Sequence, residues 1–386
     1  PQPVPAGSVA IADGQAGVYP NNSQGGWHVL GRTNSQSFDP HRPEPSTLKP
    51  GDRVRFIPVN RLDSPAPPAP QPMLYPGGIL ELAEPGALTT VQDLGRPGFQ
   101  CLGVSPGGAA DPVSARIANR LVGNPDEAAL LECCMTGPLL KFHKAARVAW
   151  LGWEDPQSGK PVEVPAGENI DLRGRMRALR GYIAVSGGLD TPVLMGSRAT
   201  DVRAGFGGHG GRTLKSGDRL PIGPQTNGPL PGDWRIQWPP AIAAGGIIEL
   251  RFVKGMQSAW FAKEIRKHFQ DNIYQVSPVS DRMGVRLEGP ALRQKEPCEL
   301  VSQPVVAGSV QVPTDGNPIV LMAERQTIGG YPQIGHVISA DLPKLARAWP
   351  GTRLKFREVT LDEAREAWRK LQRELAILQT GLDFLR

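Results

Sequence analysis

An internal repeat constrains this chain more than any other feature of its sequence. Residues 6–9 read Ala-Gly-Ser-Val, and residues 307–310 read the same. Further along, "LKPGDRVRFIPV" at 48–59 matches "AWPGTRLKFREV" at 348–359. The order is kept, and the offset drifts by only a few residues, as changes in loop length would cause. The front and the tail of the chain are therefore expected to contain copies of one structural unit.

The two copies differ in what precedes them. In the tail copy, residues 247–306 look like part of the same domain, from "IIELRFVKG" onward. The front copy has no such segment in this sequence. We therefore expect the N-terminal segment to be the last half of a domain whose first half was cut away or lies on a partner chain. Such a half-domain exposes strand edges and apolar faces, so it should be paired with something.

The composition predicts many short strands. The 386 residues include 46 glycines and 40 prolines without a collagen period, which is typical of a chain dense in turns. Short runs of Val, Ile and Leu lie between these turns and are typical of strands. The regular alternation of strand and helix that a doubly wound α/β protein would show is absent. We expect a mainly β protein built from small barrels or sandwiches.

Charge, hydropathy and cysteine spacing exclude several classes of protein. The net charge of +6 and the pI of about 9.2 are mild, and Lys and Arg are interspersed with acids, so a nucleic-acid partner is not expected. No stretch approaches the roughly 20 apolar residues of a membrane span, and the first residues do not resemble a signal peptide. The four cysteines lack C-x-x-C spacing, which favours reduced thiols in a cytoplasmic protein.

Proline-rich stretches divide the chain. We expect a half-domain at 1–60, a Pro/Ala linker at 61–77, a first barrel half at 78–226, a second at 227–360 and an amphipathic C-terminal helix at 361–386.

Two helix starts are clear from local chemistry. Asp111 is a suitable N-cap before Pro112, and Gly123 is placed to end that helix. Thr360 and Glu363 form a capping box at the start of the last helix.

Common nucleotide and metal motifs are absent or poorly placed. The stretch "GFGGHG" at 205–210 matches G-x-G-x-x-G but has neither the preceding strand nor the following helix, so we expect a mobile surface loop. No phosphate loop of the form GxxxxGK[ST] occurs. The six histidines are scattered, and no metal site is expected.

Four polar stretches flanked by glycine are the best candidates for binding chemistry. They are "LTTVQDLGRPG" (88–98), "VSGGLDTPVLMGSRATD" (185–201), "SPVSDRMGVRLEG" (277–289) and "AERQTIGGYPQIGHV" (323–337). Glycine lets the backbone approach a ligand closely. Arginine suits carboxylate or phosphate, whereas Gln and Thr suit an amide or ureido group. The alternative is that these stretches are tight turns braced by Arg–Asp pairs. The loop "GVSPGGAAD" leads into a helix N-terminus, which favours anions.

The same stretches carry a resemblance to a known family. "GALTTVQDLGRPGFQCLGVSPGGAADPVSARIANRLVGNPDEAALLE", "SDRMGVRLEG" and "LMAERQTIGGYPQIGHVISADLP" resemble the allophanate hydrolase subunit 2 family over residues 78–360. That family includes the C subunit of 5-oxoprolinase, KipA-type proteins and one part of the urea carboxylase carboxyltransferase domain. Residues 1–60 resemble the C-terminal part of subunit 1, which is the B subunit of 5-oxoprolinase or the KipI-type partner. The resemblance implies cyclophilin-like β-barrel domains. Glu324 stands where most members are expected to have Asp.

The resemblance implies three possible activities. The first is ATP-dependent opening of the 5-oxoproline lactam to glutamate together with an A-like 5-oxoprolinase partner, the ATP site being unknown. The second is carboxyl transfer to urea from biotin on a separate carrier. The third is inhibition of a histidine kinase, which is not catalysis. The segment similar to subunit 1 precedes the one similar to subunit 2, and no biotinyl motif is present, so we expect part of an ATP-dependent lactam hydrolase. The Ser-Ser-Lys pattern of an amidase is absent. Self-association stays open.

We expect the polar stretches to share one cleft for a small amide-bearing anion. Arginines would bind its carboxylate or a transferred phosphate, amide and hydroxyl side chains would hold the amide, and an aspartate would orient them or move protons. The residues expected to act in catalysis are Asp93, Asp281 and Arg325. Those expected to bind substrate are Thr90, Gln92, Arg96, Ser186, Arg198, Arg282, Gln326, Thr327 and Tyr331.

Overall fold

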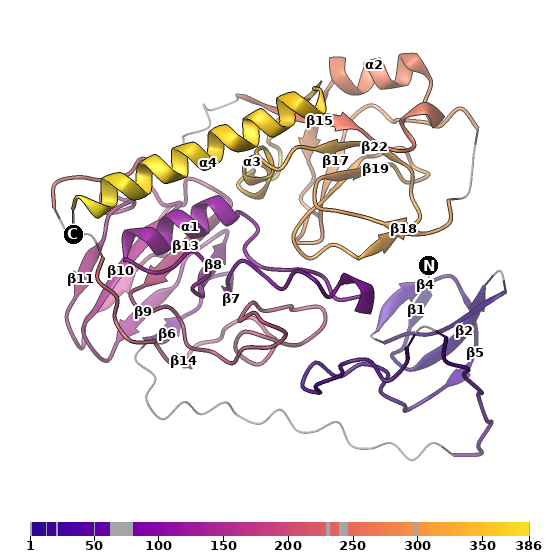
Figure 1. The fold of residues 1–386 in the computed structure, drawn as a ribbon, viewed down its shortest axis with the longest axis horizontal. Coiled ribbons are helices and arrows are strands. Elements are labelled where there is room, and N and C mark those ends of the chain that lie inside the picture. Colours follow the sequence, from indigo (N-terminus) through magenta and orange to yellow (C-terminus); the bar gives the residue numbers. More distant parts are fainter. Residues whose placement is uncertain are drawn as a thin grey trace. The chain divides into compact units, whose positions relative to one another are not determined.

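The structure is a computed structural model that divides into two compact units, Pro1–Met73 and Leu74–Arg386 (Figure 1). It describes residues 2–12, 14–20, 22–49, 51–61, 80–228, 232–238, 246–296 and 300–385. Nearly all of the linker predicted at 61–77, residues 229–231 and 239–245 at the start of the predicted second barrel half, and Cys298 lie outside the described residues.

Unit 1 contains two small antiparallel sheets. Strand β1 (Gln2–Val4) pairs with β4 (Ser23–Gly25), and the order of the second sheet is β3-β2-β5, from Gln15–Val18, Ser8–Ala12 and His28–Arg32. The inner strand β2 is buried at its first three residues, whereas β5 is exposed throughout. Unit 1 therefore has little core of its own among its described residues.

The first half of unit 2 is made of two sheets. The five-stranded sheet has the order β11-β10-β13-β8-β7, and the four-stranded sheet has the order β12-β9-β6-β14. In chain order these strands are β6 (Leu80–Glu84), β7 (Leu88–Gln92), β8 (Leu130–Cys134), β9 (Leu139–Phe142), β10 (Ala146–Leu151), β11 (Val162–Val164), β12 (Asn169–Asp171), β13 (Arg180–Val185) and β14 (Arg219–Leu220). Leu82 and Phe142 of one sheet share a core cluster with Val148 and Ile183 of the other. This half is therefore a pair of sheets packed on one core.

The second half of unit 2 is a closed barrel with the strand order β15-β22-β19-β20-β17-β16-β23. Its strands are β15 (Ile247–Lys254), β16 (Ile273–Val276), β17 (Gly284–Glu288), β19 (Ser309–Gln311), β20 (Ile319–Leu321), β22 (Gln333–Val337) and β23 (Arg353–Glu358). A separate pair joins β18 (Gln303–Pro304) and β21 (Ile328–Gly329). The rings of Phe269 and Phe356 stack at 4.3 Å between centroids inside the barrel's core cluster. Within the described residues, the closed barrel is confined to this half.

Four α-helices and two short 3-10 helices complete the described fold. The α-helices are α1 (Pro112–Leu121), α2 (Lys263–Asp271), α3 (Leu342–Ala346) and α4 (Leu361–Asp383), and the 3-10 helices are η1 (Gln100–Leu102) and η2 (Ser258–Trp260). The mainly β fold and the C-terminal helix predicted from the sequence are confirmed. None of the helices in the described part of the chain is long and apolar enough to cross a membrane.

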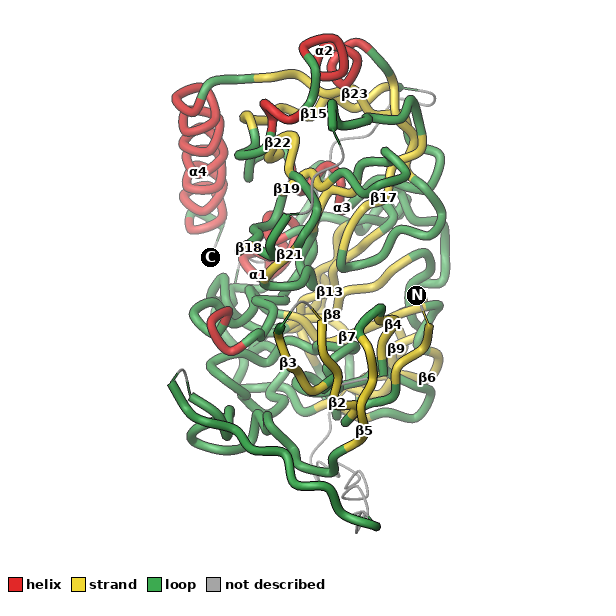
Figure 2. Tube along the Cα trace, turned by 90° about the vertical axis from the view of Figure 1, so that its right-hand side faces the viewer, coloured by secondary structure: helices red, strands yellow, loops and turns green. Residues whose placement is uncertain are grey.

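The caps predicted from the sequence are confirmed. Asp111 accepts hydrogen bonds from the backbone N–H groups of Val113 and Ser114 at the start of α1. Thr360 and Glu363 form the reciprocal capping box of α4. Helix α4 leaves the last barrel strand and runs back along α1 (Figures 1 and 2). It therefore links the barrel to the two-sheet half.

The internal repeat is also present in the hydrogen bonds of the two units. In unit 1, Gly7 donates from its N–H to Tyr19 and accepts from Thr33, at 2.7 and 2.8 Å. In the barrel, Gly308 makes the same pair of bonds with Leu321 and Val337, both at 2.8 Å. The register of β2 against β5 shifts just after Val9, and that of β19 against β22 shifts just after Val310. The copies share one local fold, including a bulge.

The prediction of a mobile surface loop at 205–210 is wrong. Residues 206–209 are buried, and Gly208 donates to the carbonyl of Arg198 at 3.0 Å. Gly207 has φ +74, and a Cβ there would lie 2.1 Å from the carbonyl oxygen of Ala199. The glycines allow positive φ and close backbone contact, so they fold this loop into the interior.

Candidate functional site

The junction between the two halves of unit 2 contains a buried carboxylate, Glu132 of β8. One carboxylate oxygen accepts from the N–H of Ala110 and the hydroxyl of Tyr182, both at 2.8 Å. The other contacts the guanidinium of Arg282 and lies 3.5 Å from Nε of Arg180. Glu132 is 1 % exposed, so these partners take the place of water around its charge.

Arg282 reaches this carboxylate from the barrel. It lies between β16 and β17, and besides Glu132 it donates to Glu324 and to the carbonyl of Gly108, both at 2.6 Å. Ser105 donates to the carbonyl of Ala323 at 3.0 Å, which adds a second bond between the halves. Loop 105–108 is thus held against the barrel, and Arg282 acts as a bridge.

The electrostatics of this bridge favour charged groups. Burial acts to raise the pKa of Glu132, but Arg282 and Arg180 with two hydrogen bonds outweigh it and hold that pKa below its usual value. Burial also raises the pKa of Glu324 despite the pull of Arg282. For Arg282, burial opposes the charge, yet the two carboxylates outweigh it and raise its pKa. The bridge is therefore a buried, ionised Arg282–Glu132 pair with a second carboxylate beside it.

The network continues to the start of α1. The N–H of Asp111 donates to the hydroxyl of Tyr182 at 2.8 Å. The fully buried Asp111 carboxylate lies 3.5 Å from Nε of Arg347, whose guanidinium packs 5.2 Å from the ring centre of Trp238. Burial raises the pKa of Asp111. A continuous polar chain therefore runs from the barrel to the cap of α1.

Asp93, a predicted catalytic residue, holds two loops together. Its carboxylate accepts from the N–H of Gly95 and the hydroxyl of Ser197, both at 2.7 Å, and from the N–H of Arg198 at 2.6 Å. These three bonds fix loop 93–96 against loop 197–198. The positioning of Arg96 depends on that arrangement.

Arg96 and Gln92 keep buried polar atoms without a partner among the described residues. Arg96 is 1 % exposed, donates to the carbonyl of Ala199 and lies 4.8 Å over the ring of Phe206, but its Nε and Nη1 have no hydrogen bond. Gln92 donates to Thr90 and Thr200 at 3.1 Å, while its Oε1 is unpaired. Unpaired atoms at such depth are uncommon in proteins.

The barrel has a similar pair in Arg325 and Gln326. Arg325 is 9 % exposed, and its Nη1 donates to the carbonyl of Met322 at 3.3 Å while its Nε has no partner within the described residues. Burial lowers its pKa. Gln326 donates to Gln311 at 3.2 Å and leaves its Oε1 unpaired. The half-buried Thr327 follows, and its carbonyl accepts from Val305 at 3.1 Å.

The structure brings some of these residues together. Burial lowers the pKa of Arg96, and the charge of Glu324, which also binds Arg282, acts against that shift. The N–H of Arg96 donates to the carbonyl of Pro106 at 2.7 Å, so both arginines touch loop 105–108. Arg325 directly follows Glu324 in the chain. Arg96 and Arg282 thus meet at one junction, with Arg325 beside it.

The other predicted residues lie in different settings. Asp281 closes a turn by accepting from Met283 and Gly284. Arg198 pairs with Asp190 at 2.7 Å on the surface. The remaining two are Ser186, which bonds to Thr226 and lines a cavity of about 560 Å³, and Tyr331, which is 47 % exposed.

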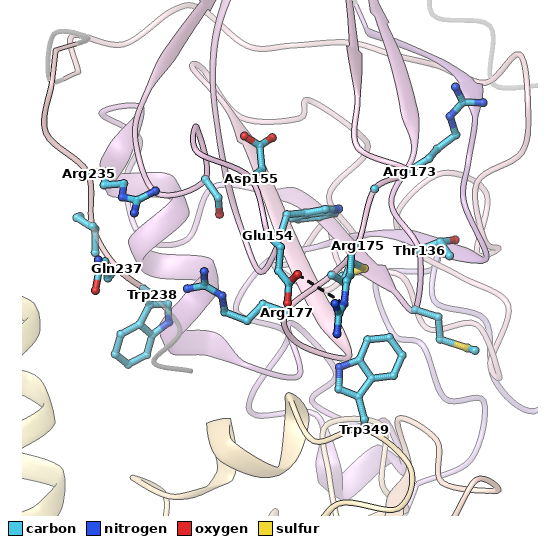
Figure 3. A pocket seen from close by; sticks show the side chains of 16 residues that line it. Thr136, Glu154, Asp155, Arg173, Arg175, Arg177, Arg235, Gln237, Trp238 and Trp349 are labelled. Carbon is cyan, nitrogen blue, oxygen red and sulfur yellow. Dashed lines mark ion pairs between the residues drawn. The ribbon is translucent and has the colours of Figure 1, made fainter. Parts of the chain in front are cut away.

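A larger cavity of about 1000 Å³ lies elsewhere in unit 2 and contains none of the predicted site residues (Figure 3). It is rich in arginine and tryptophan: Arg173, Arg175, Arg177, Arg235, Trp153, Trp238 and Trp349. Sequence reasoning missed it because its walls come from segments far apart in the chain. The alternating arginines of "LRGRMRALR" were the one available signal. The described residues include no cluster of three or more His, Cys, Asp or Glu that could hold a metal.

Comparisons with protein families and curated proteins agree with the predicted resemblance. The family model "Carboxyltransferase domain, subdomain A and B" matches residues 102–358, and "Carboxyltransferase domain, subdomain C and D" matches residues 1–48. The C subunit of 5-oxoprolinase from Escherichia coli K12 is 36% identical over 312 residues, which cover 76% of this chain and 96% of that protein. Urea amidolyase of Lachancea kluyveri is 30% identical over 335 residues, covering 80% of this chain and 18% of that protein. The B subunit of 5-oxoprolinase from E. coli O157:H7 is 56% identical over 55 residues, 14% of this chain and 25% of that protein.

Two solved structures share the fold over most of the chain. The crystal structure of TTHA0988 aligns with a TM-score of 0.81 at 35% identity, covering 92% of this chain and 72% of that one. The urea carboxylase of Kluyveromyces lactis aligns with a TM-score of 0.70 at 28% identity, covering 77% of this chain and 29% of that one. The chain belongs to the family of carboxyltransferase domains with subdomains A and B, in which its relatives include the C subunit of 5-oxoprolinase.

Proposed function

We propose that this protein is a component of an ATP-dependent 5-oxoprolinase, which opens the lactam ring of 5-oxoproline to give glutamate. The similarity to the C subunit of that enzyme, over 96% of the relative's length, supports this. The segment similar to the B subunit at the front of the chain supports it as well. In this proposal the protein acts in the cytoplasm with an A-like 5-oxoprolinase partner and with the rest of the domain that resembles the B subunit.

The observation that carries the proposal is the set of unpaired polar atoms at four predicted residues. These atoms are Oε1 of Gln92, Nε and Nη1 of Arg96, Nε of Arg325 and Oε1 of Gln326. Buried donors and acceptors are normally paired, so such atoms are suited to receive groups of a ligand. Two of the residues belong to the two-sheet half and two to the barrel.

The chemistry of these atoms fits a cyclic amide that carries a carboxylate. The ring N–H of 5-oxoproline needs an acceptor, which a glutamine Oε1 provides. Its carboxylate and ring carbonyl need donors, which the arginine guanidinium groups provide. During ring opening, negative charge develops on the carbonyl oxygen, and a fixed guanidinium beside that atom would stabilise it. Thr90 and Thr327 would complete the polar lining.

ATP would supply the free energy for opening the lactam when bound to the complex. This chain has no phosphate loop of the form GxxxxGK[ST]. The proposal therefore assigns the ATP chemistry to the A-like partner. It assigns substrate binding, orientation and stabilisation of the developing charge to this chain.

Carboxyl transfer from biotin on a separate carrier is the second candidate. It is supported by the urea amidolyase relative and by the structural likeness to urea carboxylase. The same glutamine and arginine atoms suit the ureido group of biotin or of urea, so the choice between the two activities depends on an assay.

The test is a reconstituted reaction. The complex of this protein with the A-like and B-like 5-oxoprolinase partners is mixed with ATP and 5-oxoproline, and glutamate is measured by chromatography. A parallel reaction contains a carboxybiotin carrier and urea, and a third measures inhibition of a histidine kinase. Glutamate formation that requires this chain supports the proposal. If no glutamate forms, consumption of carboxybiotin would favour the carboxyltransferase function, and inhibition of the histidine kinase would favour the inhibitor function.

A further inference from the structure

We propose that the large arginine-lined cavity binds a small-molecule oxyanion, a ligand that carries phosphate or carboxylate groups. This proposal does not rest on the proposed 5-oxoprolinase function, because the cavity shares no residue with the junction of Arg96 and Arg282.

Three parts of unit 2 build the cavity. Residues 135–136, 153–155, 158 and 173–177 come from the two-sheet half, residues 235–238 from the segment after it, and Trp349 from the barrel. The volume of about 1000 Å³ is at the upper end of the range of about 300–1000 Å³ typical of small-molecule sites. Because the cavity is concave, a small molecule fits it better than the flat surface of another macromolecule would.

The charges in the cavity are unbalanced, because four arginines line it against two carboxylates, Glu154 and Asp155. Arg175 lies 3.5 Å from Glu154, and Arg173 pairs with Asp171 and Glu84 at 2.7 Å. Arg177, however, has no hydrogen bond or ion pair from its side chain within the described residues.

Arg235 is the second unpaired arginine of the cavity. Its side chain also has no hydrogen bond or ion pair within the described part of the chain. Figure 3 shows Arg235 and Arg177 on the same side of the cavity, with Arg177 nearer to Trp238, while Arg173 points away. Two unpaired guanidinium groups can bind one oxyanion by paired N–H donors.

Indole rings give the cavity a firm apolar wall. Trp238 donates to Ser114 at 2.8 Å, and Trp153 donates to the carbonyl of Leu172 at 2.7 Å. Trp349 is half-buried and also lines the cavity. These fixed rings favour a ligand that has an apolar or planar part next to its oxyanion.

The backbone at the rim adds an independent sign of function. Met135 lines the cavity with φ 69° and is 56 % exposed. Within the described residues, only Met135 and Met195 are non-glycine residues with positive φ. Such a conformation costs about 1–3 kcal/mol and is concentrated at ligand sites.

Calorimetric titration of the full chain tests the proposal with four probes: inorganic phosphate, pyrophosphate, ATP and citrate. We expect saturable binding of at least one. The double variant Arg177→Gln/Arg235→Gln should weaken it by at least about tenfold, because it removes charge-assisted hydrogen bonds. The matched control Arg369→Gln removes a charge on the exposed face of α4 and should leave binding unchanged. Stronger binding of the phosphate probes indicates a phosphate ligand, and preference for citrate indicates a polycarboxylate.

Tryptophan fluorescence locates the binding. The bound probe should change the emission of the wild type, and Trp349→Phe should reduce that change. The proposal is overturned if none of the four probes binds the folded protein, or if the double variant binds as tightly as the wild type. It also fails if Arg369→Gln weakens binding as much as the double variant does.

Discussion

Residues 51–59 and 351–359 are two copies of one sequence pattern with opposite burial. Phe356 and Leu354 in the barrel are 1 % and 0 % exposed, whereas the matching Phe56 and Val54 in unit 1 are 49 % and 53 % exposed. In the barrel this segment forms β23 between β15 and β16. In unit 1 it has no strand partner among the described residues. The pattern specifies which side chains can share a face, but neighbouring strands decide whether they are buried.

Other parts of the repeat do not need those neighbours. Gly7 and Gly308 have φ of +79 and +89 and make matching hydrogen bonds in both units. Short-range turn and hairpin chemistry is therefore sufficient for this part of the fold. A barrel core, in contrast, requires strands from the whole domain.

The largest difference between the copies should appear on removing the matching phenylalanines. Phe356→Ala should destabilise unit 2 by about 3–5 kcal/mol, because it leaves a cavity beside Phe269. The matched variant Phe56→Ala should cost less than about 1 kcal/mol, because the ring is half exposed. Urea unfolding in a Trp27→Phe background follows unit 2 alone, since Trp27 is the only tryptophan of unit 1. Hydrogen exchange by mass spectrometry follows unit 1. Equal losses of stability in Phe356→Ala and Phe56→Ala would contradict the difference in burial between the two copies.

The buried bridge of Arg282 and Glu132 belongs to unit 2, so its loss should lower the stability of unit 2 and leave that of unit 1 unchanged. Arg282→Ala should lower the stability of unit 2 by about 3 kcal/mol at neutral pH, because Glu132 stays buried without its main cation. The exposed Arg286→Ala, four residues away, is the matched control. Denaturant unfolding measures the stability of both variants. A loss in Arg286→Ala as large as that in Arg282→Ala would contradict a stabilising role of the bridge.

Alanine at the two repeat glycines should have similar effects in both units. A Cβ would lie 2.3 Å from the carbonyl oxygen of Thr33 at Gly7, and 2.4 Å from that of Val337 at Gly308. With positive φ at both positions, each variant should lose about 2 kcal/mol. Hydrogen exchange at the neighbouring hairpins provides the measurement. A loss at only one glycine would show that the copies differ locally as well as globally.

Acid should produce the smallest effect, which we expect in unit 2. The pKa of Glu132 in the folded state is below its usual value of 4.5, so its contribution to stability is present above that pH and is lost as the pH falls through the folded value. Glu324 and Asp111 have raised pKa values and act in the opposite direction, which limits the net change. Unfolding curves between about pH 6 and pH 3, read in the Trp27→Phe background, should shift to lower denaturant. They should do so less in Arg282→Ala, where Glu132 has lost its main cation.

Local chemistry made part of this fold predictable. The repeat, the Asp111–Pro112 helix start and the Thr360–Glu363 capping box depend on residues close in sequence, and the structure confirms them. The burial of loop 206–209 could not be predicted in the same way, because it depends on contacts with Ala199.

The types of residue in the candidate site could be predicted from the sequence, but their arrangement in space could not. The unpaired atoms of Arg96 and Arg325 lie in stretches that the sequence singled out. The role of Arg282 depends on Glu132, which is 150 residues away and which no motif indicated. The arginine-lined cavity forms where segments far apart in the chain meet, and the alternating arginines of residues 172–180 were the one sequence signal for it.

The most direct test of the proposed function is the rate of glutamate release by the reconstituted complex with Arg325→Ala. The side chain of Arg325 makes one weak hydrogen bond within the described residues, so the variant should keep the unfolding temperature of the wild type. The account predicts a rate at least about 100-fold lower, because a donor to the developing charge is lost. Glutamate release at the wild-type rate, from a complex that contains the folded variant, would contradict it.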